Sequence, residues 1–406
     1  MPKDRIALDS EFGTLKSVIM HRPGKEIDRL TPYNKSELLF EDVPFLQQMQ
    51  KEHDEFTILI KQAAGAKVYR LHELLIDVLI DDNLLLGTIK DALEGSGIEE
   101  HAEEFIARYS TSECAGILLH GIKVNELKRK YKSSALNEFD DYEYLIKPNP
   151  NLYFMRDPAA VVQTGIINSR MKFPGRQRES KLLRTIFENH EDFKSKAKFI
   201  ETGTGINTCI EGGDVIVLSD KALAIGHSER TDTKAIEAVA KQVLAEGGVE
   251  RVYEVHLPKV RNCMHLDTVF TIIDENLVVT YPDAMQSVLQ TNVYRLEKID
   301  SDGDVVLSKE EINESILKVL QDEIDHLEVV ETGNGNPDYA RREQWFDGAN
   351  VFAIGPRRVI SYNRNIHTNR ALRDAGVEVL EISSSELSRG LGGPRCMTMP
   401  IERQKF

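Results

Sequence analysis

The chain has 406 residues, of which 41% are hydrophobic and 29% charged, and its formal net charge is −15 at pH 7. The acidic excess argues against a nucleic-acid or anionic-membrane surface, because both need clustered Lys and Arg. No run of about 18 apolar residues offers a membrane span, and no signal-peptide core opens the chain. The four cysteines are widely spaced, which argues against disulfides or a zinc site. We therefore expect a soluble, cytoplasmic protein that binds neither nucleic acid nor membrane.

Two stretches of about 40 residues follow the same order of predicted elements. The first begins at Glu211 with "EGGDVIVLSDKALAIGHSERTD", and the second begins at Phe346 with "FDGANVFAIGPRRVISYNRN". Each indicates two short apolar strands, a helix and a final strand. The repeated unit is therefore ββαβ.

Looser copies of this unit fill most of the remaining chain. The first opens with "LKSVIMHRPG", has its helix near Val43 to Ala63 and ends with "AKVYRL". The next opens with "NLYFMRDPAAVV", has its helix from Glu179 to Asn189 and ends near "AKFIE". A further strand pair lies in "CMHLDTVFTIIDENLVVTYPD", and its unit ends in "LEVVET". The chain thus predicts an α/β fold of five ββαβ units, which can close into a ring.

One segment departs from this pattern. Residues 73–145 have helical periodicity and no strand pair, as in "ELLIDVLIDDNLLLGTIKDAL" and "ECAGILLHGIKVNELKRKY". We predict that 73–145 form an inserted helical subdomain. Residues 1–72 and 146–406 would then form the domain built from the repeated units.

Chemically useful side chains occur where the strands of different units begin. "FMRDP" contains Asp157, "EGGD" contains Glu211, and "HLDTVF" contains His265 and Asp267, which share one face if this run is a strand. Considered alone, each motif fits a turn or a structural ion pair. Cys396, in "GLGGPRCMTMP", follows glycines that allow the backbone to approach a ligand closely. In a closed ring these positions would converge.

Such a group of side chains suits a planar cationic substrate. Buried acids are costly unless a cation compensates them, and carboxylates can bind a guanidinium group through paired hydrogen bonds. Cys396 could then attack the central carbon as a thiolate, while His265, oriented by Glu211, protonates the leaving nitrogen and activates water. Nearby carboxylates would raise the pKa of the thiol, and a bound guanidinium would oppose this effect.

Several motifs together resemble the arginine deiminase family. They occur in the order "FMRDP", "EGGD", "GHSERTD", "MHLDTVF", "EQWFDGANV", "YNRNIHTN" and "RCMTMP", and the resemblance covers nearly the whole chain. It implies the pentein fold, a five-bladed α/β propeller with a helical insertion after the first unit. It also implies hydrolysis of free L-arginine to L-citrulline and ammonia through a covalent S-alkylthiouronium intermediate, without a metal or cofactor. A homo-oligomer, either a dimer or a larger assembly, is expected from the same resemblance.

The resemblance assigns a role to each candidate residue. The nucleophile falls on Cys396, the general acid and base on His265, its partner on Glu211, and the guanidinium-binding carboxylates on Asp157 and Asp267. Four further positions match residues that bind the rest of the substrate: Arg176, Arg230, Asn151 and Phe154.

Three positions depart from the pattern of the family. Met155 stands where threonine is frequent, Arg395 stands where histidine is also common, and Leu391 stands where some members have a carboxylate-binding arginine. The contribution of this loop to substrate binding is therefore open, whereas the nucleophile assignment is unaffected.

Two alternatives of different classes remain at this point. A related pentein enzyme, such as an agmatine deiminase, a methylarginine hydrolase or an amidinotransferase, uses a similar cysteine and histidine. Arg176 and Arg230 favour a substrate with a free carboxylate over agmatine. The second alternative is a non-catalytic pentein binding module, and retention of all five reactive side chains argues against it.

Overall fold

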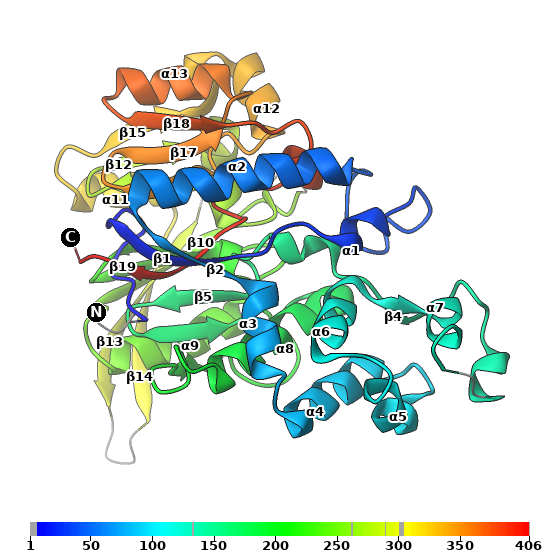
Figure 1. The fold of residues 1–406 in the computed structure, drawn as a ribbon. Helices are drawn as coiled ribbons and strands as arrows, with labels where there is room; N and C mark the ends of the chain where they lie inside the picture. Colours follow the sequence, from blue (N-terminus) through cyan, green and yellow to red (C-terminus); the bar gives the residue numbers. More distant parts are fainter. Residues whose placement is uncertain (1–5, 132–133, 261–262, 289, 300–303, 406) are drawn as a thin grey trace.

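A computed structural model describes residues 6–131, 134–260, 263–288, 290–299 and 304–405. Strands and helices alternate along the chain and give a mixed α/β fold (Figure 1). In the described residues, five sheets share one pairing scheme. The middle strand is antiparallel to the first strand and parallel to the third, as the predicted ββαβ unit requires.

Four of these sheets are each built from one continuous part of the chain. Their strands are β5 (Ala159–Val162), β6 (Gly165–Asn168) and β7 (Phe199–Ile200); β8 (Val215–Ser219), β9 (Ala222–His227) and β10 (Arg251–His256); β11 (Phe270–Asp274), β12 (Leu277–Thr280) and β15 (Glu328–Glu331); and β16 (Phe352–Gly355), β17 (Arg358–Tyr362) and β18 (Glu378–Ile382). The connections to the parallel strands contain α8 (Gln177–Asn189), α9 (Thr233–Ala245), α11 (Ile316–Glu323) and α13 (Ile366–Asp374).

The fifth sheet joins the two ends of the chain. Strand β1 (Leu15–Met20) pairs in parallel with β2 (Lys67–Arg70) after helix α2 (Leu46–Ala64), and its antiparallel partner is the last strand, β19 (Met399–Arg403). Figure 1 shows β19 beside β1, with both chain ends on the same side of the molecule. The C-terminal strand therefore completes the first unit, and Cys396 lies directly before that strand.

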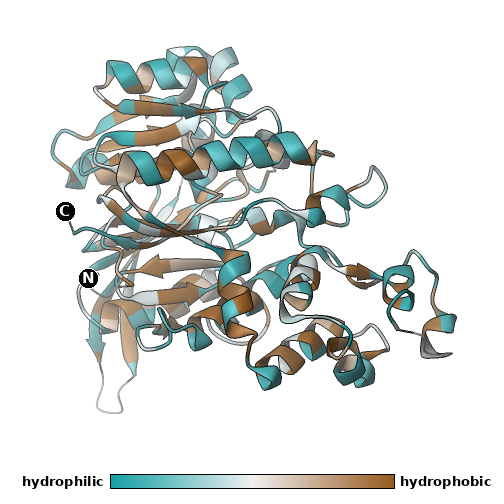
Figure 2. Cartoon of the chain, viewed as in Figure 1, coloured by the Kyte–Doolittle hydropathy of each residue, from teal (hydrophilic) through white to brown (hydrophobic). Residues whose placement is uncertain are grey.

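Burial explains why these segments form strands and helices. Every residue of β5, β12 and β16 is buried, which explains their continuous apolar sequences. In α9 the buried residues include Ile236, Val239, Ala240 and Val243, the spacing of one helix face. Figure 2 shows brown, apolar residues concentrated in the strands and teal, polar residues along α2 and α13.

A hairpin that the sequence analysis did not predict extends one of the sheets. Strand β13 (Thr291–Ile299) pairs antiparallel with β10, and β14 (Val305–Ile312) pairs antiparallel with β13. This sheet consequently has five strands in the order β14-β13-β10-β9-β8. The hairpin interrupts the fourth unit between β12 and α11.

The segment after β2 is mainly helical. It contains α3 (Leu71–Val78), α4 (Asp82–Leu93), α5 (Ala102–Ile106), α6 (Thr111–His120) and α7 (Val124–Lys128), with the 3-10 helices η1 (Glu99–His101) and η2 (Ser134–Glu138). The expectation of no strand pair here was wrong. Strand β3 (Ile122–Lys123) pairs antiparallel with β4 (Tyr144–Ile146), and the pair is too short to give an alternating pattern in the sequence.

The other helical turns lie in the loops between these elements. They include α1 (Lys25–Asp28), η3 (Pro150–Tyr153), η4 (Pro174–Arg176), α10 (Pro282–Ser287), η8 (Thr332–Gly335), α12 (Pro337–Gln344) and η9 (Leu387–Gly390). Among the described helices, none combines the length and the apolar character needed to cross a membrane.

Candidate active site

The predicted catalytic side chains lie on the segments that lead into the first strands of four sheets. Asp157 precedes β5, Glu211 precedes β8, the pair His265 and Asp267 precedes β11, and Cys396 precedes β19. The 3-10 helix η5 (Gly212–Asp214) lies between Glu211 and β8. All five side chains are buried, with exposed fractions of 5% or less.

The prediction that His265 and Asp267 share one face of a strand was wrong. The chain forms the 3-10 helix η7 (Leu266–Thr268) here, and β11 begins only at Phe270. Among the described residues, the His265 carbonyl accepts hydrogen bonds from within this turn and not from a neighbouring strand. The Thr268 N–H and the Thr268 hydroxyl both donate to it, at 3.2 and 2.7 Å. As a result, the two side chains face different partners in the same site.

The thiol of Cys396 lies against a buried ion network. Its Sγ is 3.6 Å from Oδ2 of Asp267, and the same oxygen accepts a 2.7 Å hydrogen bond from Nη1 of Arg395. Nη2 of Arg395 also donates to Oε1 of Glu11 at 2.8 Å. Arg395 thus compensates two buried carboxylates, a role that its position beside the cysteine did not reveal. Glu11 was missed because it lies far from every recognised motif.

Asn350 fixes the backbone that carries the thiol. Its Oδ1 accepts a 3.0 Å hydrogen bond from the Cys396 N–H, and its Nδ2 donates to the Asp267 carbonyl at 2.9 Å. Asp214 does the equivalent two repeats earlier, because its Oδ1 accepts a 2.9 Å bond from the Leu266 N–H beside His265. The two residues occupy the same place in "EGGDV" and "DGANV", and comparison of these motifs could have identified Asn350.

His265 lies between two carboxylates. Its Nε2 is 2.9 Å from Oε2 of Glu211, and its Nδ1 is 3.7 Å from Oδ1 of Asp157. Burial alone would lower the pKa of the imidazole, but Asp157, the hydrogen bond to Glu211 and the charge of Asp214 together raise this pKa to about 9. Burial would raise the pKa of Glu211, but the bond to His265 and the charge of Arg230 lower it. The pair is therefore an imidazolium and a carboxylate at neutral pH.

Acidic surroundings also raise the pKa of Cys396, but for a thiol this favours the neutral form, whereas for His265 it favours the charged form. Burial and the charges of Asp267, Asp157 and Asp347 raise the pKa of the thiol well above its usual value, and Arg395 offsets only part of this effect. The resting side chain is a neutral thiol. A cation that binds between these acids would favour the thiolate.

Arg176 and Arg230 differ in how fully their donors are used. Arg176 donates a 2.8 Å hydrogen bond to Oδ2 of Asp157. It also donates two hydrogen bonds to Glu179, from Nε to Oε1 at 3.0 Å and from Nη2 to Oε2 at 2.8 Å. Arg230 makes one long bond, of 3.4 Å, to Oε2 of Glu211, and its guanidinium lies 4.6 Å from the ring centre of Phe173. Within the described residues, the buried Nε of Arg230 has no hydrogen-bond partner.

Asn151 and Phe154 line the same cavity as the reactive groups. Nδ2 of Asn151 donates to the Leu38 carbonyl at 2.6 Å. The cavity has a volume of about 20 Å³, and its walls are formed by Leu39, Asn151, Phe154, Asp157, Arg176, Arg230, Met264, His265, Thr268, Gly390, Leu391 and Cys396. A single water needs about 10–15 Å³ of such volume, so the walls must separate before an amino acid can enter.

Donor atoms of Asp157, Glu211 and His265 lie within 4.8 Å of one another, so these residues could also hold a metal ion. The raised pKa of His265 opposes this use, because an imidazole must be neutral to coordinate a metal. The donor set suits proton transfer better than metal binding.

The arrangement can bind a guanidinium group and cleave it. In the described residues, Oδ1 of Asp157 and Oδ1 of Asp267 are buried and accept no hydrogen bond. Two such oxygens suit the N–H donors of a planar cation. The Cys396 thiol and the His265 imidazolium, which line the same cavity, supply a nucleophile and a general acid.

Comparison with known proteins identifies a family. The family model for arginine deiminase matches residues 36–403. An arginine deiminase of Limosilactobacillus reuteri is 38% identical over 405 residues, which cover 98% of each chain. An arginine deiminase of Oenococcus oeni is 36% identical over 411 residues, covering 99% of this chain and 98% of the relative.

Solved structures with much lower sequence identity share the fold. DDAH from Pseudomonas aeruginosa, complexed with citrulline, has a TM-score of 0.52 at 16% identity, covering 95% of this chain and 99% of that chain. The N-terminal domain of ArgZ, an arginine dihydrolase from cyanobacteria, has a TM-score of 0.55 at 14% identity, covering 95% of this chain and 97% of that domain. These neighbours belong to the pentein superfamily. By sequence, the chain belongs to the arginine deiminase family of hydrolases, which act on the C–N bonds of amidines.

Proposed function

We propose that this protein hydrolyses free L-arginine to L-citrulline and ammonia, with Cys396 as the nucleophile. One observation carries the proposal: Asp157 and Asp267 each keep one buried carboxylate oxygen that accepts no hydrogen bond from the described residues, in a site shared with the Cys396 thiol. An uncompensated buried acceptor is costly, and a substrate guanidinium offers the matching N–H donors.

The geometry supports the following sequence of steps. The guanidinium binds to Asp157 and Asp267, and its charge lowers the pKa of the Cys396 thiol, which loses its proton to solvent. The thiolate attacks the central carbon, the C–N bond breaks, and ammonia leaves with a proton from the His265 imidazolium. The neutral imidazole then removes a proton from water, which attacks the S-alkylthiouronium carbon. Loss of the thiolate gives O-protonated citrulline, and transfer of this proton to the sulfur restores the neutral thiol.

Glu211 would support both proton transfers. Its carboxylate, 2.9 Å from Nε2 of His265, stabilises the imidazolium before ammonia leaves and again after water has lost its proton. The other ring nitrogen faces Asp157 and is therefore the one closer to the bound guanidinium. This orientation suits a general acid.

Arg230 is the better candidate for the substrate α-carboxylate. It has one long bond to Glu211 and a buried Nε without a partner in the described residues. Arg176 is occupied by Glu179 and Asp157, so it would have to release Asp157 before contacting the substrate. Asn151 and Phe154 would contact the backbone and the stem of the substrate.

The larger organisation is part of the same proposal. We infer that the five sheets close into a five-bladed α/β propeller, and the pairing of β19 with β1 supports closure. Residues 73–145 would be a helical insertion into the catalytic domain of residues 1–72 and 146–406. We also expect a homo-oligomer in the cytoplasm, and sedimentation of the purified protein would test the assembly.

The direct test is citrulline and ammonia release from L-arginine by wild type and Cys396→Ala, with agmatine as a second substrate. We expect turnover of arginine alone, lost in the variant. Turnover of agmatine instead would assign the protein to the related deiminases, and release of neither product would refute the hydrolase.

A further inference from the structure

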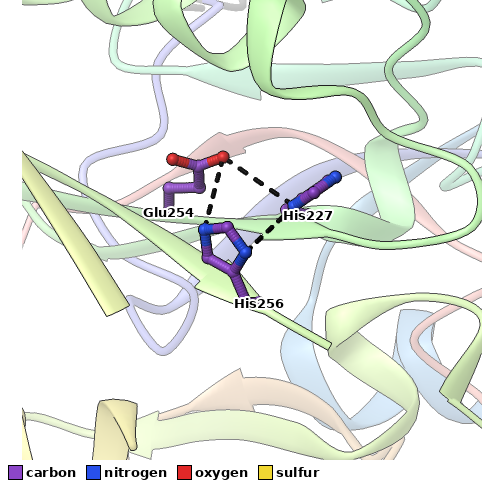
Figure 3. Close-up of side chains that lie close together, drawn as sticks. All are labelled: His227, Glu254 and His256. Carbon is purple, nitrogen blue, oxygen red and sulfur yellow. Dashed lines mark hydrogen bonds and ion pairs between the residues drawn. The ribbon is translucent and has the colours of Figure 1, made fainter. Parts of the chain in front are cut away.

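Two histidines and a glutamate lie together outside the catalytic cavity (Figure 3). His227 is the last residue of β9, and His256 is the last residue of the parallel strand β10. The two are direct partners in the register of these strands, and Glu254 lies two positions before His256, on the same face of β10. The backbone pairing therefore brings the three side chains together.

The two imidazoles point at one another. Nδ1 of His227 is 3.1 Å from Nδ1 of His256. Two nitrogens bound to one tetrahedral ion at about 2.1 Å would be about 3.4 Å apart, so a separation change of a few tenths of an ångström suffices. The side chains of His227 and His256 are 24% and 27% exposed, so an ion can enter from solvent and keep water ligands.

Glu254 supplies the charge that such an ion needs. Its side chain is fully buried, and its oxygens accept hydrogen bonds from Thr233, Asn292 and Tyr294. In the described residues, no Lys or Arg lies within 4.0 Å of this carboxylate, and its ion-pair partners there are the two imidazoles, which are charged only when protonated. A buried carboxylate with no permanent cation beside it is costly, and a bound divalent ion would compensate it.

The second ring nitrogen of His256 lies near the Glu254 carboxylate. Nε2 lies 3.6 Å from Oε1 of Glu254. A histidine that binds a metal through one nitrogen commonly donates its other N–H to a carboxylate, which fixes the tautomer. An ion between the two Nδ1 atoms would move the His256 ring proton to Nε2, facing Glu254. Asn292, 3.0 Å from this nitrogen, would retain its 2.7 Å bond to Glu254.

We propose that His227 and His256 bind a divalent transition-metal ion of the zinc class through their Nδ1 atoms, with Glu254 as the carboxylate partner of His256. Imidazole ligands select such ions over Mg²⁺ or Ca²⁺. The ion links the C-terminal ends of β9 and β10. The loops that follow these two strands carry Arg230 and His265. This proposal does not depend on the catalytic one.

The test is calorimetric titration of chelator-treated protein with Zn²⁺. We expect one strong site per chain, and at least 100-fold weaker binding in His227→Ala and in His256→Ala. Glu254→Gln should weaken binding by about 10- to 100-fold. His326→Ala removes an exposed histidine elsewhere on the chain and should bind as wild type does.

The catalytic cluster of Asp157, Glu211 and His265 is the competing site. A Cys396→Ala/His265→Ala variant should retain the strong Zn²⁺ site, and its loss there would overturn the proposal. Unchanged binding in His227→Ala, or no binding to wild type, would also overturn it.

A second measurement uses only the wild-type protein, so a misfolded variant cannot affect its result. Diethylpyrocarbonate labelling, mapped by mass spectrometry, should show His227 and His256 protected by Zn²⁺ and His326 unaffected. Equal labelling of all three with and without Zn²⁺ would contradict the site.

Discussion

Oδ2 of Asp267 lies 3.6 Å from the Cys396 thiol and accepts a 2.7 Å hydrogen bond from Arg395. The carboxylate that would bind the substrate therefore also helps to keep the resting thiol protonated. Binding of a guanidinium cation at this carboxylate would remove that restraint, so substrate binding and nucleophile activation are coupled through one side chain.

Asp267→Asn should separate these two effects. The loss of a neighbouring negative charge should lower the pKa of the Cys396 thiol, because Asp267 is the charged group that raises it most. Arginine turnover should nevertheless fall by about 100-fold or more, because one guanidinium-binding carboxylate is lost. Ultraviolet absorbance of the thiolate, with Cys396→Ala as baseline, measures the pKa. An unchanged thiol titration would contradict the coupling.

Glu211→Gln should move the alkaline limb of the pH–rate profile to lower pH. Asp157 and Glu211 hold the pKa of His265 above its usual value, so the imidazolium that protonates the leaving nitrogen persists to about pH 9. Without the Glu211 charge this pKa falls, and the acid form is lost earlier by about one to two pH units. The measurement is kcat against pH with saturating arginine. An alkaline limb that does not move would exclude His265 as the group that titrates there.

The same raised pKa predicts a pH-dependent contribution to stability. The folded-state pKa of His265 lies above the unfolded value of about 6.5, so the stabilisation is complete below that pH and is lost as pH rises through about 9. The free energy of unfolding should therefore differ more between wild type and His265→Gln at pH 6 than at pH 10. The change in this difference should be about 2–3 kcal/mol. A difference independent of pH, measured by urea unfolding, would contradict the assignment.

Arg230→Leu should change substrate preference. If Arg230 holds the α-carboxylate, the variant should raise KM for arginine by about 100-fold and lower the preference for arginine over agmatine, because agmatine has no carboxylate. Steady-state kinetics with both substrates give the ratio. Equal losses with both substrates would show that Arg230 acts through its bond to Glu211 instead.

Arg395→Met should be strongly destabilising. The guanidinium lies 2.8 Å from Glu11 and 2.7 Å from Asp267, and all three side chains are buried. Its removal leaves Asp267 without its ion pair and, among the described residues, leaves Glu11 with only the longer, 3.6 Å pair to Arg156, a change that costs about 3–5 kcal/mol. Glu11→Gln in the same chain should recover part of this loss. Denaturant unfolding measures both, and no recovery would argue against a Glu11–Arg395 pair.

Periodicity in the sequence was sufficient to predict the repeated unit. Strand pairs such as β8 and β9, and helices such as α8 and α9, lie where apolar runs and helical spacing placed them, because burial imposes those patterns directly. One strand of the sheet that joins the two ends of the chain could not be predicted in this way. Strand β19 pairs with β1 across almost the entire chain, and no local pattern encodes a partner at that distance.

In the site, too, local sequence patterns pointed to some residues, whereas partners distant in the sequence could not be predicted from such patterns. Motifs pointed to Asp157, Glu211, His265 and Asp267 because these residues lie near strands that periodicity predicts, and to Cys396 because it follows a glycine-rich loop. The partners that set their charges come from elsewhere. Glu11 reaches the site through tertiary contacts alone, and the 3-10 turn at Leu266 forms because Asp214 binds its backbone.

Glycine at position 392 is required by close packing. A Cβ built there would lie 2.1 Å from Cε1 of Phe154, a distance at which the ring or the loop must move. Gly392→Ala should therefore displace the loop that carries Cys396, lowering kcat/KM by about 10-fold or more and the free energy of unfolding by about 1–3 kcal/mol. Thermal unfolding and steady-state kinetics measure the two effects.

Gly87→Ala is the matched control for this substitution. Gly87 lies within α4, and its Cβ would meet no atom within 4 Å, so alanine should raise the free energy of unfolding by up to about 1 kcal/mol. Phe154→Leu combined with Gly392→Ala should recover stability, because the smaller side chain makes room for the added methyl group. Recovery of stability without recovery of KM would show that Phe154 also contacts the substrate, whereas a Gly392→Ala variant as active and stable as wild type would show that the loop does not need this close approach.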